Sequence, residues 1–227
     1  MIWYRHPFDY FHKGKGNADD SGAATSGLTF DMYFQDDGNH AVYYAPYSAN
    51  TGFYYVQNND KTQHFFNSLL MRGDMIIATK SHQAPLIALL AEHASLYGLK
   101  VKILPRDSNE FPGGHAFHRS RGFMKDLLSG KLAGDGDFEQ PYVFHMSWTL
   151  NKDAKVKYYQ QLGEWYLKPE CAQKTISEVE KANNSSSVFE RCCLVEPIVV
   201  CHYRDKPSKI PCHDSPPIDK GRPSFWK

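Results

Sequence analysis

The 227-residue sequence predicts an α/β fold, and two observations carry that prediction. Short aromatic or β-branched runs, which are typical of strands, alternate along the chain with longer segments whose apolar residues recur at helical spacing. Strands that alternate with helices favour a sheet with helices packed on its faces. Hydrophobic residues make up 41% of the chain and charged residues 22%, so the chain can bury a core of ordinary size.

The elements follow from local patterns. The apolar or alternating runs predict short strands at residues 2–4, 29–35, 52–57, 100–104 and 142–145. Apolar residues at helical spacing predict helices at residues 60–72, 83–97, 124–128 and 152–166. Gly98 is a stop signal for the second of these helices, because glycine readily takes the left-handed conformation that ends a helix. Residues 13–26 are rich in Gly, Asp, Ser and Ala and are predicted as a surface loop.

The composition changes after Pro169, which predicts two domains: residues 1–168, and an irregular Cys- and Pro-rich tail over 169–227 with little core of its own. The five cysteines all lie in this tail, at positions 171, 192, 193, 201 and 212. Their clustering favours disulfides formed in an oxidising compartment, with one cysteine left over. A zinc site with His202 and His213 is the alternative, but no C-x-x-C pair supports it. Asn183 and Asn184 begin overlapping glycosylation sequons.

The charge and hydropathy exclude some function classes. The formal net charge is +1, which gives no electrostatic reason to expect nucleic acid or an anionic membrane as a partner. No apolar stretch is long enough for a transmembrane helix, and no signal peptide is visible. The chain begins inside a predicted strand at Ile2, so we expect that the natural protein continues upstream.

Three polar segments sit at predicted strand ends, where ligands bind in open α/β sheets. The first is Gln35-Asp36-Asp37-Gly38, whose carboxylates offer oxygen ligands for Mg²⁺ or Mn²⁺ or, alternatively, form a solvated turn. The second is Ser48-Ala49-Asn50-Thr51-Gly52, just before a predicted strand, and it is either a ligand-binding segment or a plain loop. The third is Phe144-His145-Met146-Ser147-Trp148, in which His145 is a candidate metal ligand or base, or else a structural histidine. No nucleophile elbow, Walker loop or G-x-G-x-x-G motif is present.

Taken in order, these segments resemble the nucleotide-diphospho-sugar transferase family, which includes plant cell-wall arabinosyltransferases. The resemblance covers roughly residues 1–167 and rests mainly on the N-x-G-F-Y-Y-V run from Asn50 and the H-x-x-W run from His145. It implies the C-terminal portion of a Rossmann-like GT-A sandwich, a nucleotide-diphospho-sugar donor and a divalent metal, Mn²⁺ or Mg²⁺. It also implies a Golgi-lumenal catalytic domain of a type II membrane protein, with the membrane anchor upstream of this chain.

Carried over residue by residue, the resemblance implies catalytic roles for Asp36, Asp37 and Gln83 and a metal-ligand role for His145. The implied donor- or substrate-binding residues are Asn50, Thr51, Gly52, Gly113, Gly114, Trp148 and Lys152, with Lys152 meeting a phosphate. The sequence departs from the family pattern at His82, where an Asp is expected, and at Ser147, where an Asn is expected. The family's D-x-D metal motif would lie directly before Ile2.

Three functions are open at this point. The first is transfer of a sugar from a nucleotide-sugar to a glycan or glycoprotein, and the second is a non-catalytic, glycan- or partner-binding relic of such an enzyme. The third is a metal-dependent hydrolase that uses His115, His118 and His145. A sheet without upstream strands would expose apolar edges, so we expect the isolated chain to be only marginally stable.

Overall fold

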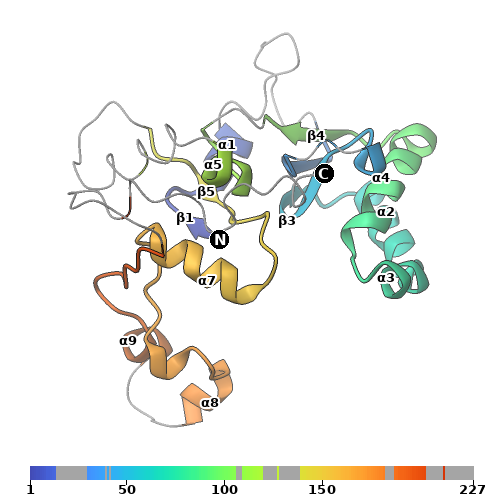
Figure 1. The fold of residues 1–227 in the computed structure, drawn as a ribbon. Coiled ribbons are helices and arrows are strands. Elements are labelled where there is room, and N and C mark those ends of the chain that lie inside the picture. Colours follow the sequence, from blue (N-terminus) through green and yellow to red (C-terminus); the bar gives the residue numbers. More distant parts are fainter. Residues whose placement is uncertain are drawn as a thin grey trace.

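The computed structural model describes residues 1–13, 30–38, 40, 42–105, 109–119, 127, 139–181, 187–202 and 212. Figure 1 shows the arrangement of the helices and strands along the chain. In chain order they are β1 (Ile2–Trp3), α1 (Pro7–Lys13), β2 (Met32–Asp36), η2 (Val42–Tyr44), β3 (Ala49–Val56), α2 (Asp60–Leu70), α3 (Gly73–Thr79), α4 (Gln83–Tyr97), β4 (Val101–Leu104), α5 (Gly114–Arg119), β5 (Val143–Phe144), α7 (Lys152–Gln161), η3 (Pro169–Cys171), α8 (Ile176–Lys181) and α9 (Val188–Cys192).

The described strands form two small sheets. In the larger sheet β2 lies between β3 and β4, antiparallel to β3 and parallel to β4. β1 and β5 form a separate antiparallel pair. This mixture of helices and mixed sheet confirms the predicted α/β class, whereas the Rossmann-like GT-A sandwich stays a prediction.

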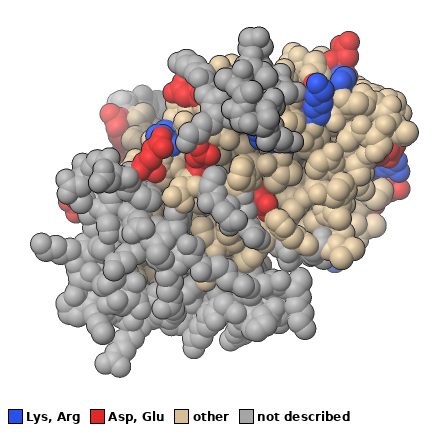
Figure 2. All heavy atoms as spheres, turned by 90° about the horizontal axis from the view of Figure 1, so that it is seen from above, with Lys and Arg blue, Asp and Glu red and all other residues tan. Residues whose placement is uncertain are grey.

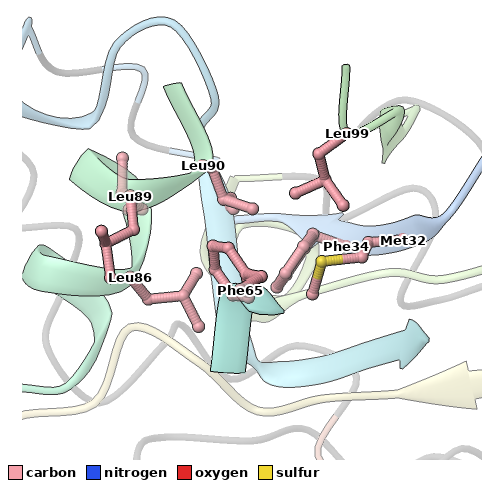
Figure 3. Close-up of a cluster of buried hydrophobic side chains, with 9 residues drawn as sticks. Met32, Phe34, Phe65, Leu86, Leu89, Leu90 and Leu99 are labelled. Carbon is pink, nitrogen blue, oxygen red and sulfur yellow. The ribbon is translucent and has the colours of Figure 1, made fainter. Parts of the chain in front are cut away.

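Strand β2 is buried on both faces, because its alternating side chains enter two different cores. On one face Met32 and Phe34 pack against helices α2 and α4, as Figure 3 shows for Phe65 of α2 and the leucines of α4. On the other face Tyr33 joins an aromatic cluster that includes Phe11 of α1 and Phe111. A strand covered on both sides has little freedom to slip, so its C-terminal end is held in a fixed place.

A second core lies under α5 and α7. β5 contributes Phe144, and Met146 follows two residues later. Helix α7 contributes Tyr158 and Tyr159, and Leu162 follows its last residue. Val143, one residue before Phe144, belongs to the aromatic cluster beneath β2. β5 therefore connects the two cores and brings the residues that follow it, beginning with His145, close to the end of β2.

The predicted elements match the structure where the local signals are strong. Helix α4 has the predicted bounds, and Gly98 ends it in the left-handed conformation with φ of 62°. The predicted helix at 60–72 ends earlier, at Leu70, which is 78% exposed although it is apolar. Helix α3 was not predicted. The predicted helix at 152–166 ends at Gln161, because the chain turns at Gly163 with φ of 67°.

Two further predictions concern segments that the structure describes only in small part. The predicted loop at 13–26 falls outside the described residues except for Lys13, which ends α1. The predicted helix at 124–128 likewise has only Leu127 described, and that residue is helical and buried.

The segment after Pro169 contains the short helices η3, α8 and α9, where the sequence predicted irregular structure. Disulfides join Cys171 to Cys192 and Cys201 to Cys212, and Cys193 is free. The disulfide interpretation is therefore confirmed, and the alternative zinc site on these cysteines is wrong. The sequon asparagines lie outside the described residues.

The described residues show neither a membrane-spanning helix nor, on the face seen in Figure 2, a cluster of like charges. Among the described helices none has the length and apolar character needed to cross a membrane. On the face drawn in Figure 2, the charged side chains of the described residues are scattered, with both signs present.

Candidate functional site

The predicted polar segments meet at the C-terminal end of β2. Because β3 runs antiparallel to β2, the first residues of β3 lie beside the last residues of β2, with Gln35 opposite Asn50 and Asp36 opposite Ala49. The segment at 48–52 is thus mainly the start of a strand rather than the plain loop that was the alternative. We call the group formed by Gln35, Asp37, Asn50, Gln83 and His145 the polar cluster.

Asp37 occupies the centre of the polar cluster. It is 8% exposed, and its Oδ1 accepts hydrogen bonds from Asn50 Nδ2 at 2.9 Å and Gln83 Nε2 at 3.2 Å. Burial raises the pKa of this carboxyl group, and the two amide hydrogen bonds oppose that shift. The alternative of a solvated turn is wrong, because both Asp36 and Asp37 are buried.

Asp36 is held by its own turn rather than by the polar cluster. Its Oδ1 accepts a hydrogen bond from the backbone N–H of Gly38 at 2.6 Å, and His40 Nε2 donates to the same carboxylate at 2.8 Å from Oδ2. Gly38 has φ of 83°, where a residue with a Cβ atom is strained, and a Cβ there would lie 3.0 Å from the Trp148 ring. Two adjacent carboxylates therefore have separate sets of partners.

A bulge in β3 shapes the next part of the site. The register shifts between Phe34 and Gln35, so residues 51–53 of β3 have no direct partner on β2. Within this bulge the N–H and hydroxyl of Thr51 both donate to Gln83 Oε1 at 3.2 Å. A Cβ atom on Gly52 would overlap the His145 ring. The glycine in the N-x-G segment therefore has a physical role, which is to let the imidazole lie against the backbone.

The hydrogen bonds of Gln35 set the tautomer of His145. Gln35 Nε2 donates to the backbone carbonyls of Phe111 and Pro112, both at 2.9 Å, which turns its Oε1 toward His145 Nδ1 at 3.0 Å. His145 Nδ1 must then carry the proton, and Nε2 keeps its lone pair. Burial, with a contribution from the positive charge of Lys155, lowers the pKa of His145 to about 4. His145 is therefore neutral at physiological pH.

Gly113 and Gly114 pack directly against the segment that follows β5. Gly113 forms a parallel bridge with His145, and Gly114 N donates to Ser147 Oγ at 2.8 Å. A Cβ atom on Gly114 would overlap the backbone carbonyl oxygen of Ser147. Trp148 donates from Nε1 to the backbone oxygen of Asp37 at 2.6 Å, which ties this segment to the end of β2.

Lys152 is a predicted site residue that the structure does not bring to the polar cluster. It is exposed at the first turn of α7. Lys155, one turn further along, is partly buried, and its charge lowers the pKa of His145. Lys155 is thus the lysine of this helix whose charge acts on the site.

Sequence reasoning missed Lys155 and gave no role to Gln35 and Ser147, although both lie in the polar strand-end segments that it singled out. Gln35 carried a visible signal, since it is an amide in an otherwise apolar and aromatic strand, and a buried amide needs partners. Ser147 was noted only as a departure from the family pattern, although its hydroxyl binds Gly114 N. Lys155 carried no signal, because its position relative to His145 depends on how α7 packs.

The described residues do not by themselves make a metal centre. No three His, Cys, Asp or Glu side chains in the described part of the chain are close enough together to hold a cation. His145 Nε2 is a suitable single ligand, but the carboxylate oxygens of Asp36 and Oδ1 of Asp37 already accept hydrogen bonds. His118 on α5 is buried and its ring contacts Phe117 and Tyr158, so among the described residues the three histidines of the hydrolase hypothesis do not form a metal site.

The fold and the polar cluster together define a class of protein. In α/β proteins, polar side chains gathered at a strand end are a common place for ligand binding. The comparison with protein families gives the more particular identification: the chain belongs to the nucleotide-diphospho-sugar transferase family, which it matches over residues 1–159. No curated protein and no solved structure matches the chain.

Proposed function

We propose that this protein transfers a sugar from a nucleotide-diphospho-sugar to a hydroxyl group of a glycan or glycoprotein, and that the polar cluster binds the donor. The observation that carries the proposal is the convergence of Asp37, Asn50, Gln83 and His145 at one strand end inside the family-matched region. These residues are far apart in the sequence, so a shared role explains their meeting better than chance does.

Each residue of the cluster has chemistry that suits the donor. Both described hydrogen bonds to Asp37 fall on Oδ1, so Oδ2 is the atom that would accept a hydroxyl of the donor. His145 Nε2, with its lone pair, would accept another hydroxyl or bind a cation. The positive charge of Lys155, which contributes to the lowered pKa of His145, would favour the diphosphate of the donor.

The family resemblance also implies Mn²⁺ or Mg²⁺, which would neutralise the diphosphate leaving group. The described residues supply His145 as one ligand and do not complete a site. We therefore assign no step to a metal, and metal dependence enters the test as an independent variable.

Calorimetric titration with uridine and guanosine diphosphosugars, in Mn²⁺ and in EDTA, tests the proposal. We expect binding of at least one donor, and a weakening of about tenfold in Gln83→Ala, which removes the amide that holds both Asp37 and Thr51. Gln63→Ala is the matched control, because Gln63 is an exposed amide on α2 that bonds only to Asn58 among the described residues. Equal donor affinity in both variants would contradict the proposal.

One observation favours a second candidate function, a non-catalytic glycan- or partner-binding relic. The carboxylate that the family pattern has directly before Gln83 is replaced by His82. A folded chain that binds glycans but no nucleotide-sugar, with or without Mn²⁺, would support this function instead.

We further propose that the protein resides in the secretory pathway, in the Golgi lumen. The two disulfides support this location, because such bonds persist in oxidising compartments. Alkylation of the unfolded, unreduced protein from its native cells is expected to label one cysteine, Cys193, of the five. Labelling of all five would contradict the location.

A further inference from the structure

A cleft of about 330 Å³ opens beside Asp36. Its walls include Asp36, His40, Tyr44, Pro46, Ser48 and Ile103. It lies on the other face of β2 from Gln35, because successive strand residues point to opposite faces. Tyr44 and Ile103 bear this out, since both pack against the core cluster that contains Met32 and Phe34. The cleft and the polar cluster are therefore neighbours that share the end of β2.

Ser48 is the least explained residue of the cleft. Its Oγ is buried and has no hydrogen-bond partner among the described residues. Its backbone is fixed, because the carbonyl oxygen of Ser48 accepts a hydrogen bond from Asp37 N at 2.7 Å. A buried hydroxyl without a partner is unfavourable for folding, so its presence in a cleft wall points to a ligand that supplies the missing hydrogen bond.

The remaining walls narrow the chemistry of that ligand. Asp36 and His40 form a hydrogen-bonded pair at the polar side of the cleft, and the His40 side chain is 54% exposed. Tyr44, Pro46 and Ile103 supply an apolar side. The described lining holds a carboxylate and no lysine or arginine, which disfavours an anionic ligand such as a phosphate. A ligand with hydroxyl groups on its edge and an apolar face fits both sides, and a sugar ring has that character.

We propose that this cleft binds a sugar unit of the acceptor, with Ser48 Oγ and the Asp36–His40 pair as its hydrogen-bonding groups. The assignment of this sugar as an acceptor rests on the proposed transferase function, whereas the binding itself does not. A donor at Asp37 and an acceptor at Asp36 would lie on opposite sides of the chain, so they would meet beyond the C-terminal end of β2, where the strand no longer separates them.

NMR titration of the labelled chain with methyl β-galactopyranoside and methyl α-arabinofuranoside tests the proposal. We expect the amide signals of Ser48 and Gly38 to shift with a millimolar dissociation constant. Ser48→Ala should weaken binding about 2- to 10-fold, the range for one neutral hydrogen bond. The same variant should leave the melting temperature unchanged or raised, because the lost hydroxyl has no partner to lose.

Ser68→Ala is the matched control. Among the described residues, Ser68 Oγ donates only to the backbone carbonyl of His64, in an exposed hydrogen bond within α2. Its binding of both glycosides should equal that of the unchanged chain. The proposal is overturned if neither glycoside shifts the cleft signals, if Ser48→Ala binds as well as Ser68→Ala, or if Ser48→Ala lowers the melting temperature markedly.

Titration of the same samples with uridine diphosphate separates this proposal from the proposed function. Glycoside binding without nucleotide binding would uphold the cleft as a carbohydrate site while the transferase assignment fails. Nucleotide binding without glycoside binding would overturn the cleft and leave the donor site intact.

Discussion

The part of the chain that matches the family and the segment after Pro169 are stabilised in different ways. In the matched part, β2 is covered on both faces by large buried side chains, and the site residues extend from its end. In the later segment the buried cluster consists of Cys171, Val179 and Cys192, and a disulfide joins two of its three members. The difference teaches that the site depends on burial in the sheet, whereas the tail depends on a covalent link.

The first way to sharpen this comparison is to remove a large side chain from each part. Phe65 is fully buried against β2, and Phe189 on α9 is 74% exposed. Phe65→Ala should lower the free energy of unfolding by about 3–5 kcal/mol, and Phe189→Ala by less than about 0.5 kcal/mol. Urea unfolding followed by circular dichroism measures both. Similar losses of unfolding free energy in the two variants would contradict the difference between the buried sheet and the later segment.

The second test breaks the covalent link of the tail. The disulfide spans 21 residues, so its loss should destabilise that segment by about 3 kcal/mol. In the Cys171→Ser, Cys192→Ser double variant we expect faster proteolysis at 172–191 and an unchanged unfolding transition for the sheet.

Cys193→Ser is the control for this test, because Cys193 is a free thiol in the same segment. It should cleave at the rate of the unchanged chain. Loss of cooperative unfolding of the sheet in the double variant would show that the two parts are not independent.

The third test uses the close packing of the site backbone. Gly114→Ala places a Cβ atom on the Ser147 carbonyl oxygen and should cost about 1–3 kcal/mol, measured by urea unfolding. Gly73→Ala is the matched control, since a Cβ there has no neighbour within 4 Å and alanine favours helix α3. An equal change in the free energy of unfolding in the two variants would contradict the close contact between Gly114 and Ser147.

The fourth test is the pH dependence of stability. Burial lowers the pKa of folded His145 to about 4, below its unfolded value near 6.5, so the unfolded chain binds more protons between these values. The contribution of His145 to the free energy of unfolding is therefore fully present above pH 6.5 and is lost as the pH falls toward 4. After allowance for partial exposure, the loss is up to about 2 kcal/mol.

His145→Asn is the comparison for this fourth test, because its amide can still donate to Gln35 and does not titrate. Free energies of unfolding are measured from pH 4.5 to 7 in both proteins. We expect the variant to lose stability less steeply as the pH falls. Parallel curves would contradict a buried, neutral His145.

The sequence predicted much of this arrangement because strong local signals determine it. Helix α4 was placed with correct bounds by its apolar spacing and by Gly98, and the site residues were found at polar strand ends. The start of β3 was read as a loop because Asn50, Thr51 and Gly52 have low strand preference, and pairing with β2 overrides it. The role of Lys155 depends on how α7 packs, so no local pattern revealed it, and the partners of the buried amide of Gln35 likewise became known only from the tertiary structure.

The central claim is that the carboxylate of Asp37 binds the donor at the end of β2, and calorimetry of Asp37→Asn against Asp74→Asn tests it most directly. Asp74 is an exposed carboxylate in the first turn of α3, so its change alters the same charge away from the site. The account predicts donor affinity about tenfold weaker in Asp37→Asn and unchanged in Asp74→Asn. Equal donor affinity in both variants, or a folded unchanged chain that binds no nucleotide-sugar, would contradict it.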